Sequence, residues 1–466
     1  MHHLRMGSAK GAGEANAALA AVISETGRSH AALARKVNEL AALQGVVTRY
    51  DKASVTRWLQ GMIPRDRAPE FIAAALAEFL GRPVAPVDLG FPEQLQRPVV
   101  ARALTYREDV GETLHTLAEL GSTDISRRSL LGAVPFVATA LMDPQRQWLL
   151  WLLEEDQAPR LAAVADGGPV AQVQAMIDMF DEMDNRFGGG GVRASIVHYL
   201  STQLAPMLQQ RNMPTHQRRL LYTSAAKMAA TAGWCSYDTA DYGLAERYMI
   251  QALRLCAEGG DRVLGGQILA GMSHLATSLG NPAEGVSLAR AGIATAKMAG
   301  SPLGLMRLHA MAARGYAALG DSRQATASLQ AAGKRLEISR GPAEESPWVR
   351  FLDHHYLEAE AALVHRDLGE ASQAERLANA SVEANSDRRR RQAISRSVLA
   401  TAFLQQDRLD EAVDTADNAL DLLSGVHSER SVQALRDFRA RLTPHHGEPI
   451  VREFELRARP ILGTAA

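Results

Sequence analysis

Side chains that could contact nucleic acid gather in one short segment, DKASVTRWLQG, at residues 51–61. At helical spacing Val55, Trp58 and Leu59 share one face, which would hold the segment to a core. The cationic and hydroxyl-bearing side chains share the opposite face: Lys52, Ser54, Thr56 and Arg57. A solvated amphipathic helix in any all-helical domain has the same pattern, so these residues alone leave both interpretations open.

Each outward residue suits one part of a DNA duplex. Ser54 and Arg57 are the candidates for base edges, because a hydroxyl and a guanidinium can donate to acceptors in the major groove. Ala53 is small enough to allow close approach or to contact a thymine methyl group. The remaining candidates would contact phosphates and so position the helix without reading sequence: Lys52, Thr56, Arg65 and Arg67.

Three further predicted helices surround this segment. NAALAAVISETG (16–27) ends at a glycine, SHAALARKVNEL (29–40) begins at the candidate N-cap Ser29, and a last helix covers 69–80. This order is typical of a helix-turn-helix domain, in which the second helix of the motif enters the major groove. Up to Arg67 the chain has ten Lys and Arg against five Asp and Glu, although the whole chain has a net charge of −1. A DNA-binding surface would therefore be local.

The Leu33-Ala34 pair and the string SVTRWLQG resemble the Cro/repressor-type helix-turn-helix. The longer run RWLQGMIPRDRAPEFIAAALAEFLGRPVAPVDLGF resembles one group of that type, namely long regulators of differentiation, sporulation and antibiotic production in filamentous bacteria. The resemblance implies a cytoplasmic transcription regulator, often a repressor. The gap from Leu33 to Val55 is about twice that of the compact motif, so NELAALQGVVTRYD is predicted to be an extended helix or an enlarged turn.

The long C-terminal part contains a repeat marked by two small residues seven positions apart. The pairs are Ala245/Ala252, Gly285/Gly292, Ala325/Ala332, Ala374/Ser381 and Ala412/Ala419. Turn residues stand five positions before four of these pairs: Gly280, Gly320, Gly369 and Asp407. Two helical turns separate the members of a pair, so both lie on one helix face and let a neighbouring helix approach closely. The pattern over 216–424 resembles the tetratricopeptide repeat, with a period longer than the usual ~34 residues.

First helices of such repeats line the concave side of a solenoid. Counting from each turn gives the inward positions Lys227, Trp234, Tyr237, Gln267, His274, Arg307, Arg314 and Tyr356. Cationic and aromatic groups in a groove suit a signalling peptide, a carboxylate ligand or the tail of a protein partner. The alternative is that these are ordinary superhelix residues that bind nothing.

The sequence therefore predicts an all-α protein in which an N-terminal helix-turn-helix domain precedes a tetratricopeptide-like α-solenoid. The predicted divisions are a DNA-binding domain at 1–92, a connector at 93–143, leading helices at 144–215, repeats with a capping helix at 216–443, and a tail at 444–466. Pairing through the repeats into a homodimer is expected, since helix-turn-helix domains usually bind two half-sites.

Other functions find little support in the residues. No nucleophile–base set, metal-ligand spacing or phosphate loop stands out, so we expect neither an enzyme nor a metal or other cofactor. The arginine run at 388–391 is expected to be the solvated start of a helix, with a phosphate contact as the alternative. Two cysteines and an N-terminus without a signal-peptide core fit a cytoplasmic protein with no membrane contact. The remaining alternative is a protein-interaction scaffold whose N-terminal domain docks a protein rather than double-stranded DNA.

Overall fold

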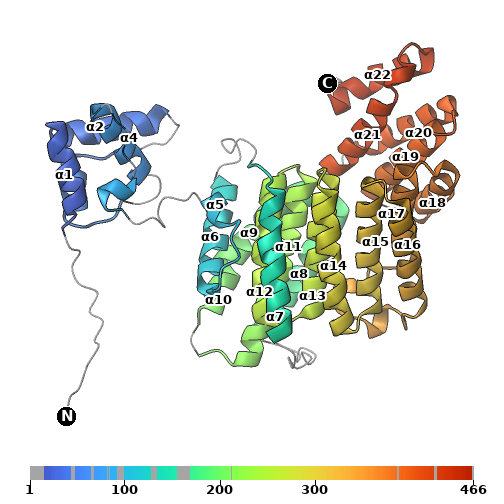
Figure 1. Ribbon diagram of the computed structural model, residues 1–466, viewed down its shortest axis with the longest axis horizontal. Helices are drawn as coiled ribbons and strands as arrows, with labels where there is room; N and C mark the ends of the chain where they lie inside the picture. Colours follow the sequence, from blue (N-terminus) through green and yellow to red (C-terminus); the bar gives the residue numbers. More distant parts are fainter. Residues whose placement is uncertain are drawn as a thin grey trace. The chain divides into compact units, whose positions relative to one another are not determined.

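The structure is a computed structural model. It describes residues 15–43, 48–64, 68–80, 82, 84, 86–91, 99–126, 134–154, 168–210, 212–385, 388–424 and 428–463. The described residues form helices and connecting turns, with no strand among them. The chain divides into two compact units, Met1–Arg102 and Ala103–Ala466 (Figure 1).

The N-terminal unit is a small helical domain with one core. Its helices are α1 (Ala17–Thr26), α2 (His30–Leu43), α3 (Lys52–Leu59), α4 (Ala68–Leu80), the 3-10 turn η1 (Pro86–Leu89) and α5 (Val99–Arg102). Leu19, Leu33, Val37, Ile72 and Leu76 are fully buried in that core and hold the helices together.

Local signals set the helix ends of this unit. Asn16 caps α1 by accepting the Leu19 amide at 2.9 Å, and Gly27 ends that helix with φ of 61°. Ser29 accepts the Ala32 amide at 3.2 Å at the start of α2. Helix α2 runs on to Leu43, and residues 48–50 are irregular. Part of the long spacing after Leu33 is thus a helix extension, and residues 44–47 lie outside the described residues.

The second unit is an α-solenoid preceded by a helical scaffold. The scaffold comprises α6 (Val110–Ser126), η3 (Ala138–Leu141), α7 (Met142–Glu154), α8 (Pro169–Phe187), α9 (Gly189–Tyr199), the π-helical turn η4 (Leu200–Leu204) and α10 (Ala205–Leu208). Trp148 of α7 is fully buried, and its indole N–H donates to Thr295 Oγ1 at 3.0 Å. The scaffold is therefore packed onto the solenoid.

Five helical hairpins form the solenoid and stack side by side in chain order (Figure 1). They are α11 (Thr215–Asp238) with α12 (Tyr242–Gly259), α13 (Arg262–Ser278) with α14 (Pro282–Ala299), α15 (Pro302–Ala318) with α16 (Ser322–Glu337), α17 (His354–Asp367) with α18 (Ala371–Ala384), and α19 (Arg389–Leu404) with α20 (Leu409–Leu422). Between α16 and α17 lie the short turns η5 (Pro342–Glu344) and η6 (Pro347–Val349). The stack ends with α21 (Glu429–Arg441), η7 (Thr443–His445) and α22 (Pro449–Leu462).

The small residues of the repeat pattern lie where the sequence placed them, between packed helices. A β-carbon on Gly285 would come within 2.1 Å of Thr277 Oγ1, and one on Gly292 within 2.2 Å of Leu308 Cδ2. The seven-residue spacing therefore places small residues where neighbouring helices pack closely.

All five hairpin turns contain a residue with left-handed backbone geometry. Two of these residues are not glycine: Ala240 has φ of 62° and Asp407 has φ of 58°.

Two segments are more ordered than expected. The segment read as a connector contains α6, whose Leu114, Leu117 and Leu120 are buried, and Gly121 lets α6 approach Val197 of α9. The segment read as a tail contains α22, whose Phe454 packs edge-on against Phe438 with ring centroids 5.9 Å apart. Among the described residues, no helix is both long and apolar enough to cross a membrane.

Candidate functional site

Helix α3 is anchored from beneath by two apolar side chains. Val55 is 0% exposed and Trp58 is 3% exposed, and the Trp58 ring meets Tyr50 in an edge contact with centroids 5.1 Å apart. On the opposite side Lys52, Ala53 and Arg57 are exposed. Helix α3 thus has the two-faced arrangement that its sequence indicates, except at Ser54 and Thr56.

Ser54 does not lie on the free face, and the expectation that it contacts a base edge needs correction. It is 6% exposed. Its amide and hydroxyl both donate to Asp51 Oδ1 at 2.8 Å, and its hydroxyl accepts the Asp51 amide at 3.3 Å. This reciprocal pattern is a capping box that begins α3. These hydrogen bonds to Ser54 lower the pKa of Asp51.

The remaining candidates near α3 differ in how available they are. Thr56 is partly buried, and its hydroxyl donates to the Lys52 carbonyl at 3.0 Å. Arg57 Nη2 donates to the Ser54 hydroxyl at 3.2 Å while the side chain stays exposed. Arg65 and Arg67 lie outside the described residues. Lys52, Ala53 and Arg57 are therefore the accessible set.

A side chain that the sequence did not single out holds the connection before α3. Asn38 of α2 donates to the Tyr50 carbonyl at 2.8 Å, and its carbonyl oxygen accepts the Thr48 hydroxyl at 2.7 Å and the Tyr50 amide at 2.9 Å. The side-chain amide of Asn38 thereby holds residues 48–50 against α2, directly before α3 begins. An Asn in the middle of a helix, where its propensity is poor, was the available signal.

The eight residues expected in the solenoid groove all line one cavity of about 580 Å³. Helices α11, α13, α15, α17, α19 and α21 supply most of its wall, which agrees with the expectation that first helices of repeats face inward. Predicted inward positions that lie 129 residues apart, Lys227 and Tyr356, thus border the same space.

Aromatic side chains form one wall of this cavity. The rings of Trp234, Tyr237 and His274 meet edge-on, with centroid separations of 5.4 to 5.9 Å. Burial, followed by the nearby arginines, lowers the pKa of His274 well below its ordinary value. The neutral ring then accepts a hydrogen bond at Nδ1 from Arg314, whose Nη1 lies 2.8 Å away. Arg314 also forms an ion pair with Glu360 at 3.3 Å.

A second buried arginine lies over two rings. The Arg307 guanidinium is 5.8 Å from the Trp234 centroid and 5.7 Å from that of Phe351. Its Nη1 donates to Gln267 Oε1 at 2.6 Å, while Arg307 Nε and Gln267 Nε2 meet no acceptor among the described residues. Gln267 and Arg307 are 6% and 8% exposed. Buried donors without an acceptor cost on the order of 1–3 kcal/mol each.

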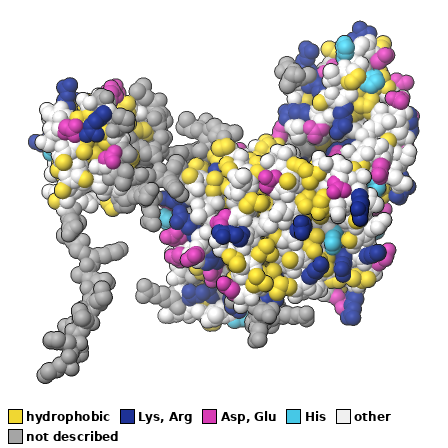
Figure 2. Space-filling view, viewed as in Figure 1, with side chains coloured by type: hydrophobic (Ala, Val, Ile, Leu, Met, Phe, Trp, Pro, Cys, Tyr) yellow, Lys and Arg dark blue, Asp and Glu magenta, His cyan; other side chains and the backbone are white. Residues whose placement is uncertain are grey.

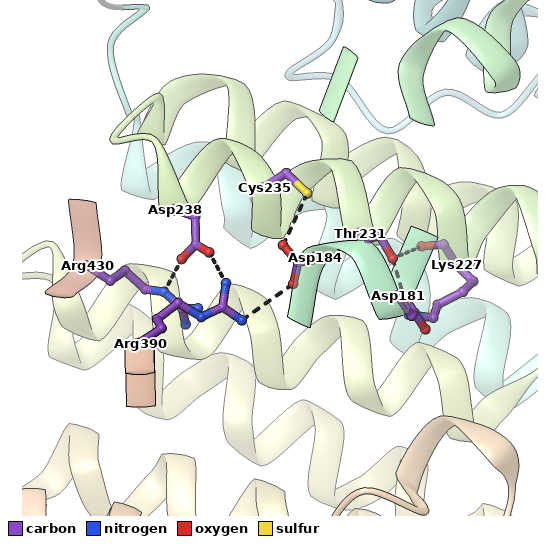
Figure 3. A network of polar contacts seen from close by, with 8 residues as sticks. All are labelled: Asp181, Asp184, Lys227, Thr231, Cys235, Asp238, Arg390 and Arg430. Carbon is purple, nitrogen blue, oxygen red and sulfur yellow. Dashed lines mark hydrogen bonds and ion pairs between the residues drawn. The ribbon is translucent and has the colours of Figure 1, made fainter. Parts of the chain in front are cut away.

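An ion-pair network joins the two ends of the helix stack (Figure 3). Asp238 of α11 is 2% exposed and accepts from Arg390 of α19 and from Arg430 of α21. Arg390 also reaches Asp184 of α8 at 3.5 Å. The expectation that the arginine run at 388–391 is solvated is thus wrong for Arg390, which is paired and mostly buried.

The rest of the surface gives little sign of a further site. Cationic and anionic side chains are intermixed over the visible face of the repeat unit (Figure 2). Within the described part of the chain, no group of three or more His, Cys, Asp or Glu could hold a metal ion. Both cysteines are buried, and burial is the main cause that raises the pKa of Cys235 and Cys256. Over the described ranges, the exposed face of α3 and the cavity are the candidates for binding.

Comparison with known protein families matches part of the N-terminal unit. Residues 19–92 match the family of the SP15 N-terminal domain. The match extends from α1 to the residue after Phe91 and leaves the repeat unit unmatched. No curated protein matches the chain. The matched residues include α3, and the match carries no indication of what they bind.

Proposed function

We propose that the protein is a DNA-binding transcription regulator whose repeat unit senses a ligand or partner. The observation that carries the proposal is the exposure of Lys52, Ala53 and Arg57 on one face of a helix whose other face is locked by Val55 and Trp58. The resemblance to negative regulators of differentiation and antibiotic production supports a repressor role.

The dimensions of α3 are compatible with a DNA groove. An α-helix with its side chains is ~10–12 Å across, and the major groove, ~12 Å wide, admits it. Arg57 is the side chain best suited to a guanine edge, because a guanidinium can donate two parallel hydrogen bonds to it. Lys52, at the other end of the helix, suits a phosphate, and so does the exposed Arg49 just before α3.

The anchoring of α3 also favours recognition over loose attraction. The Asp51–Ser54 capping box fixes where α3 begins, and the Asn38 hydrogen bonds fix the chain that leads into it. A helix held at its start and along one face presents its exposed side chains in a defined register, as readout of base edges requires. Two copies of the chain would present two such helices to paired half-sites.

Fluorescence anisotropy with labelled genomic fragments, including the promoter of the protein's own gene, tests the proposal. We expect specific binding by the full-length protein that weakens as salt increases. Arg57→Ala should weaken specific binding by ~1–3 kcal/mol and relax the preference at one base position. Arg82→Ala is the matched control, because Arg82 is already paired with Glu25 at 2.6 Å. Equal affinities of the two variants for every fragment would remove α3 from a DNA interface.

A second candidate is a scaffold whose N-terminal unit docks a protein. The observation that favours it is the exposure of two apolar side chains just after α3, Met62 at 54% and Ile63 at 48%. A docking domain would retain a protein partner in a pull-down and show no salt-sensitive DNA binding. Met62→Ser with Ile63→Ser would then abolish partner retention, whereas a DNA-reading unit would lose more through Arg57→Ala.

A further inference from the structure

The cavity of the repeat unit has an excess of positive charge. Eight Lys and Arg side chains line it against five Asp and Glu side chains. Five of these cations form ion pairs with carboxylates: Lys227 with Asp181, Arg314 with Glu360, Arg366 with Asp367, and both Arg390 and Arg430 with Asp238. The excess positive charge of the cavity therefore lies on the arginines that form no ion pair.

Three arginines that line the cavity form no ion pair with a described carboxylate: Arg307, Arg391 and Arg388, of which Arg388 is exposed. Arg307 is hydrogen-bonded to the neutral Gln267, and no described acid pairs with it. The side chain of Arg391 of α19 forms no hydrogen bond or ion pair with a described residue. Burial is the main cause that lowers the pKa of Arg391, and the charge of Glu360 acts in the opposite direction. Tyr356 forms a hydrogen bond with Arg307 and interacts electrostatically with Arg391. Burial raises the pKa of Tyr356 to about 12, so its hydroxyl is neutral and does not supply a counter-charge.

Uncompensated charge in a half-buried site is expensive unless an anion occupies it. A guanidinium presents several donors in a planar fork that matches a carboxylate. The unsatisfied donors of Arg307 and Gln267 add to the demand for an acceptor at this place. Glu360 is the nearby described carboxylate, but its ion pair is with Arg314, so the guanidiniums of Arg307 and Arg391 are available to an anionic ligand.

The walls beside these arginines select for a flat apolar group. Trp234 and Phe351 flank the Arg307 guanidinium, and Trp234 continues into the edge-packed cluster with His274. At about 580 Å³ the cavity lies within the range of ~300–1,000 Å³ typical of small-molecule sites. The ion pairs of Asp238 join α11 to α19 and α21, so an extended peptide could not leave along that side without breaking them. A compact ligand fits better than a long chain.

We propose that this cavity binds a small organic acid whose carboxylate pairs with Arg391 and Arg307 while its flat apolar body lies against Trp234 and Phe351. The inference names the ligand class for the sensing role of the repeat unit, and in that sense it rests on the proposed function. It does not depend on whether the sensed state binds or releases DNA.

Two matched probes test the charge requirement on the full-length protein. 1-Anilinonaphthalene-8-sulfonate has a flat ring system with an anionic group, and N-phenyl-1-naphthylamine has the same rings without the charge. We expect saturable fluorescence enhancement by the sulfonate at one site per chain, with affinity at least tenfold tighter than for the neutral probe. Equal affinities, or no saturable binding of the sulfonate, would overturn the proposal.

Substitutions locate the site. Arg391→Gln should reduce affinity for the sulfonate at least tenfold more than affinity for the neutral probe, whereas Arg441→Gln, an exposed arginine of α21, should change neither. Circular dichroism confirms that each variant is folded; if Arg391→Gln is not, Gly271→Leu serves as a second variant, because a side chain there would enter the space beside Trp234. An unchanged sulfonate affinity in the folded variant would contradict the site. DNA binding by the wild type is measured separately, without probe. A protein that binds the sulfonate but not DNA would contradict the proposed function alone, and one that binds DNA but not the sulfonate would contradict the ligand site alone.

Discussion

Asp238 and Arg430 form a buried ion pair although 192 residues separate them in the chain. Asp238 ends the first helix of the solenoid, and Arg430 lies at the start of α21, after the last hairpin. Arg390 completes the arrangement from α19 (Figure 3). The two ends of the helix stack are therefore joined through one carboxylate, and the cavity is bordered by this junction.

The shared ion pairs of Asp238 predict that replacing its charged carboxylate by a neutral amide lowers the stability of the protein strongly. Asp238→Asn removes the one charge that both arginines share, and leaves them without their main acceptor in a mostly buried place. We expect the free energy of unfolding to fall by ~2–4 kcal/mol, somewhat below the ~3–5 kcal/mol typical of fully buried pairs, because Arg430 is partly exposed. Urea denaturation measures it, with exposed Asp437→Asn of α21 as control. Identical midpoints for the two variants would show that the junction contributes nothing.

A pair of glycines predicts opposite effects of the same substitution. A β-carbon on Gly243 of α12 would lie 2.1 Å from the Val134 carbonyl oxygen and 2.7 Å from that of Pro135. Since backbone must shift, Gly243→Ala should destabilise the protein by ~1–3 kcal/mol. Gly333, within α16, has no atom within 4 Å of that position, so Gly333→Ala should stabilise by ~0.5–1 kcal/mol. Thermal melts compare the two, and a change of the same sign in both would refute the packing argument.

A buried carboxyl predicts a dependence of stability on pH. Glu246 is fully buried, and that burial raises its pKa to about 7, against the hydrogen bond from the Val137 amide at 3.0 Å. The pKa of Glu246 in the folded protein exceeds its unfolded value of 4.5. The neutral carboxyl therefore contributes its full stabilisation below pH 4.5, and this stabilisation is lost as the pH rises through 7. Between pH 5 and pH 8 the free energy of unfolding of the wild type should fall by up to about 3 kcal/mol more than that of Glu246→Gln. This follows from ~1.4 kcal/mol per unit of difference between the folded and unfolded pKa.

Denaturation at several pH values checks this. Gln keeps an oxygen for the Val137 amide, so the variant isolates the effect of charge. Glu383→Gln, at an exposed position of α18, should keep the pH dependence of the wild type. Parallel pH curves for the wild type and Glu246→Gln would mean that Glu246 does not titrate in this range.

Repetition made the solenoid predictable from the sequence. Small residues seven positions apart recur through the repeat region, and each pair requires a close helix neighbour whatever the rest of the sequence does. The same count from each turn found the inward residues, which is why side chains as distant as Lys227 and Tyr356 were placed on one groove. Local periodicity sufficed because each hairpin packs against the next.

Contacts that follow no sequence repeat could not be predicted from the sequence. Arg390 and Arg430 meet Asp238 only through the closure of the whole stack, which no local pattern encodes. Ser54 was assigned to the outward face by helical spacing alone. Its position three residues after Asp51, an N-cap type, was the signal of a capping box and competes with that assignment. The segment at 93–143 was predicted to be a connector, whereas it contains α6, in which Gly121 permits close contact with α9.

The central claim is that the exposed face of α3 reads DNA. Capture of fragmented genomic DNA on the immobilised full-length protein, followed by sequencing, tests it most directly when the wild type is compared with a Lys52→Ala, Arg57→Ala double variant. We expect the wild type to enrich a small set of fragments sharing a paired motif, and the double variant to lose this enrichment while its helical content is unchanged. Enrichment of no fragment by the wild type, or of the same fragments by both proteins, would contradict it.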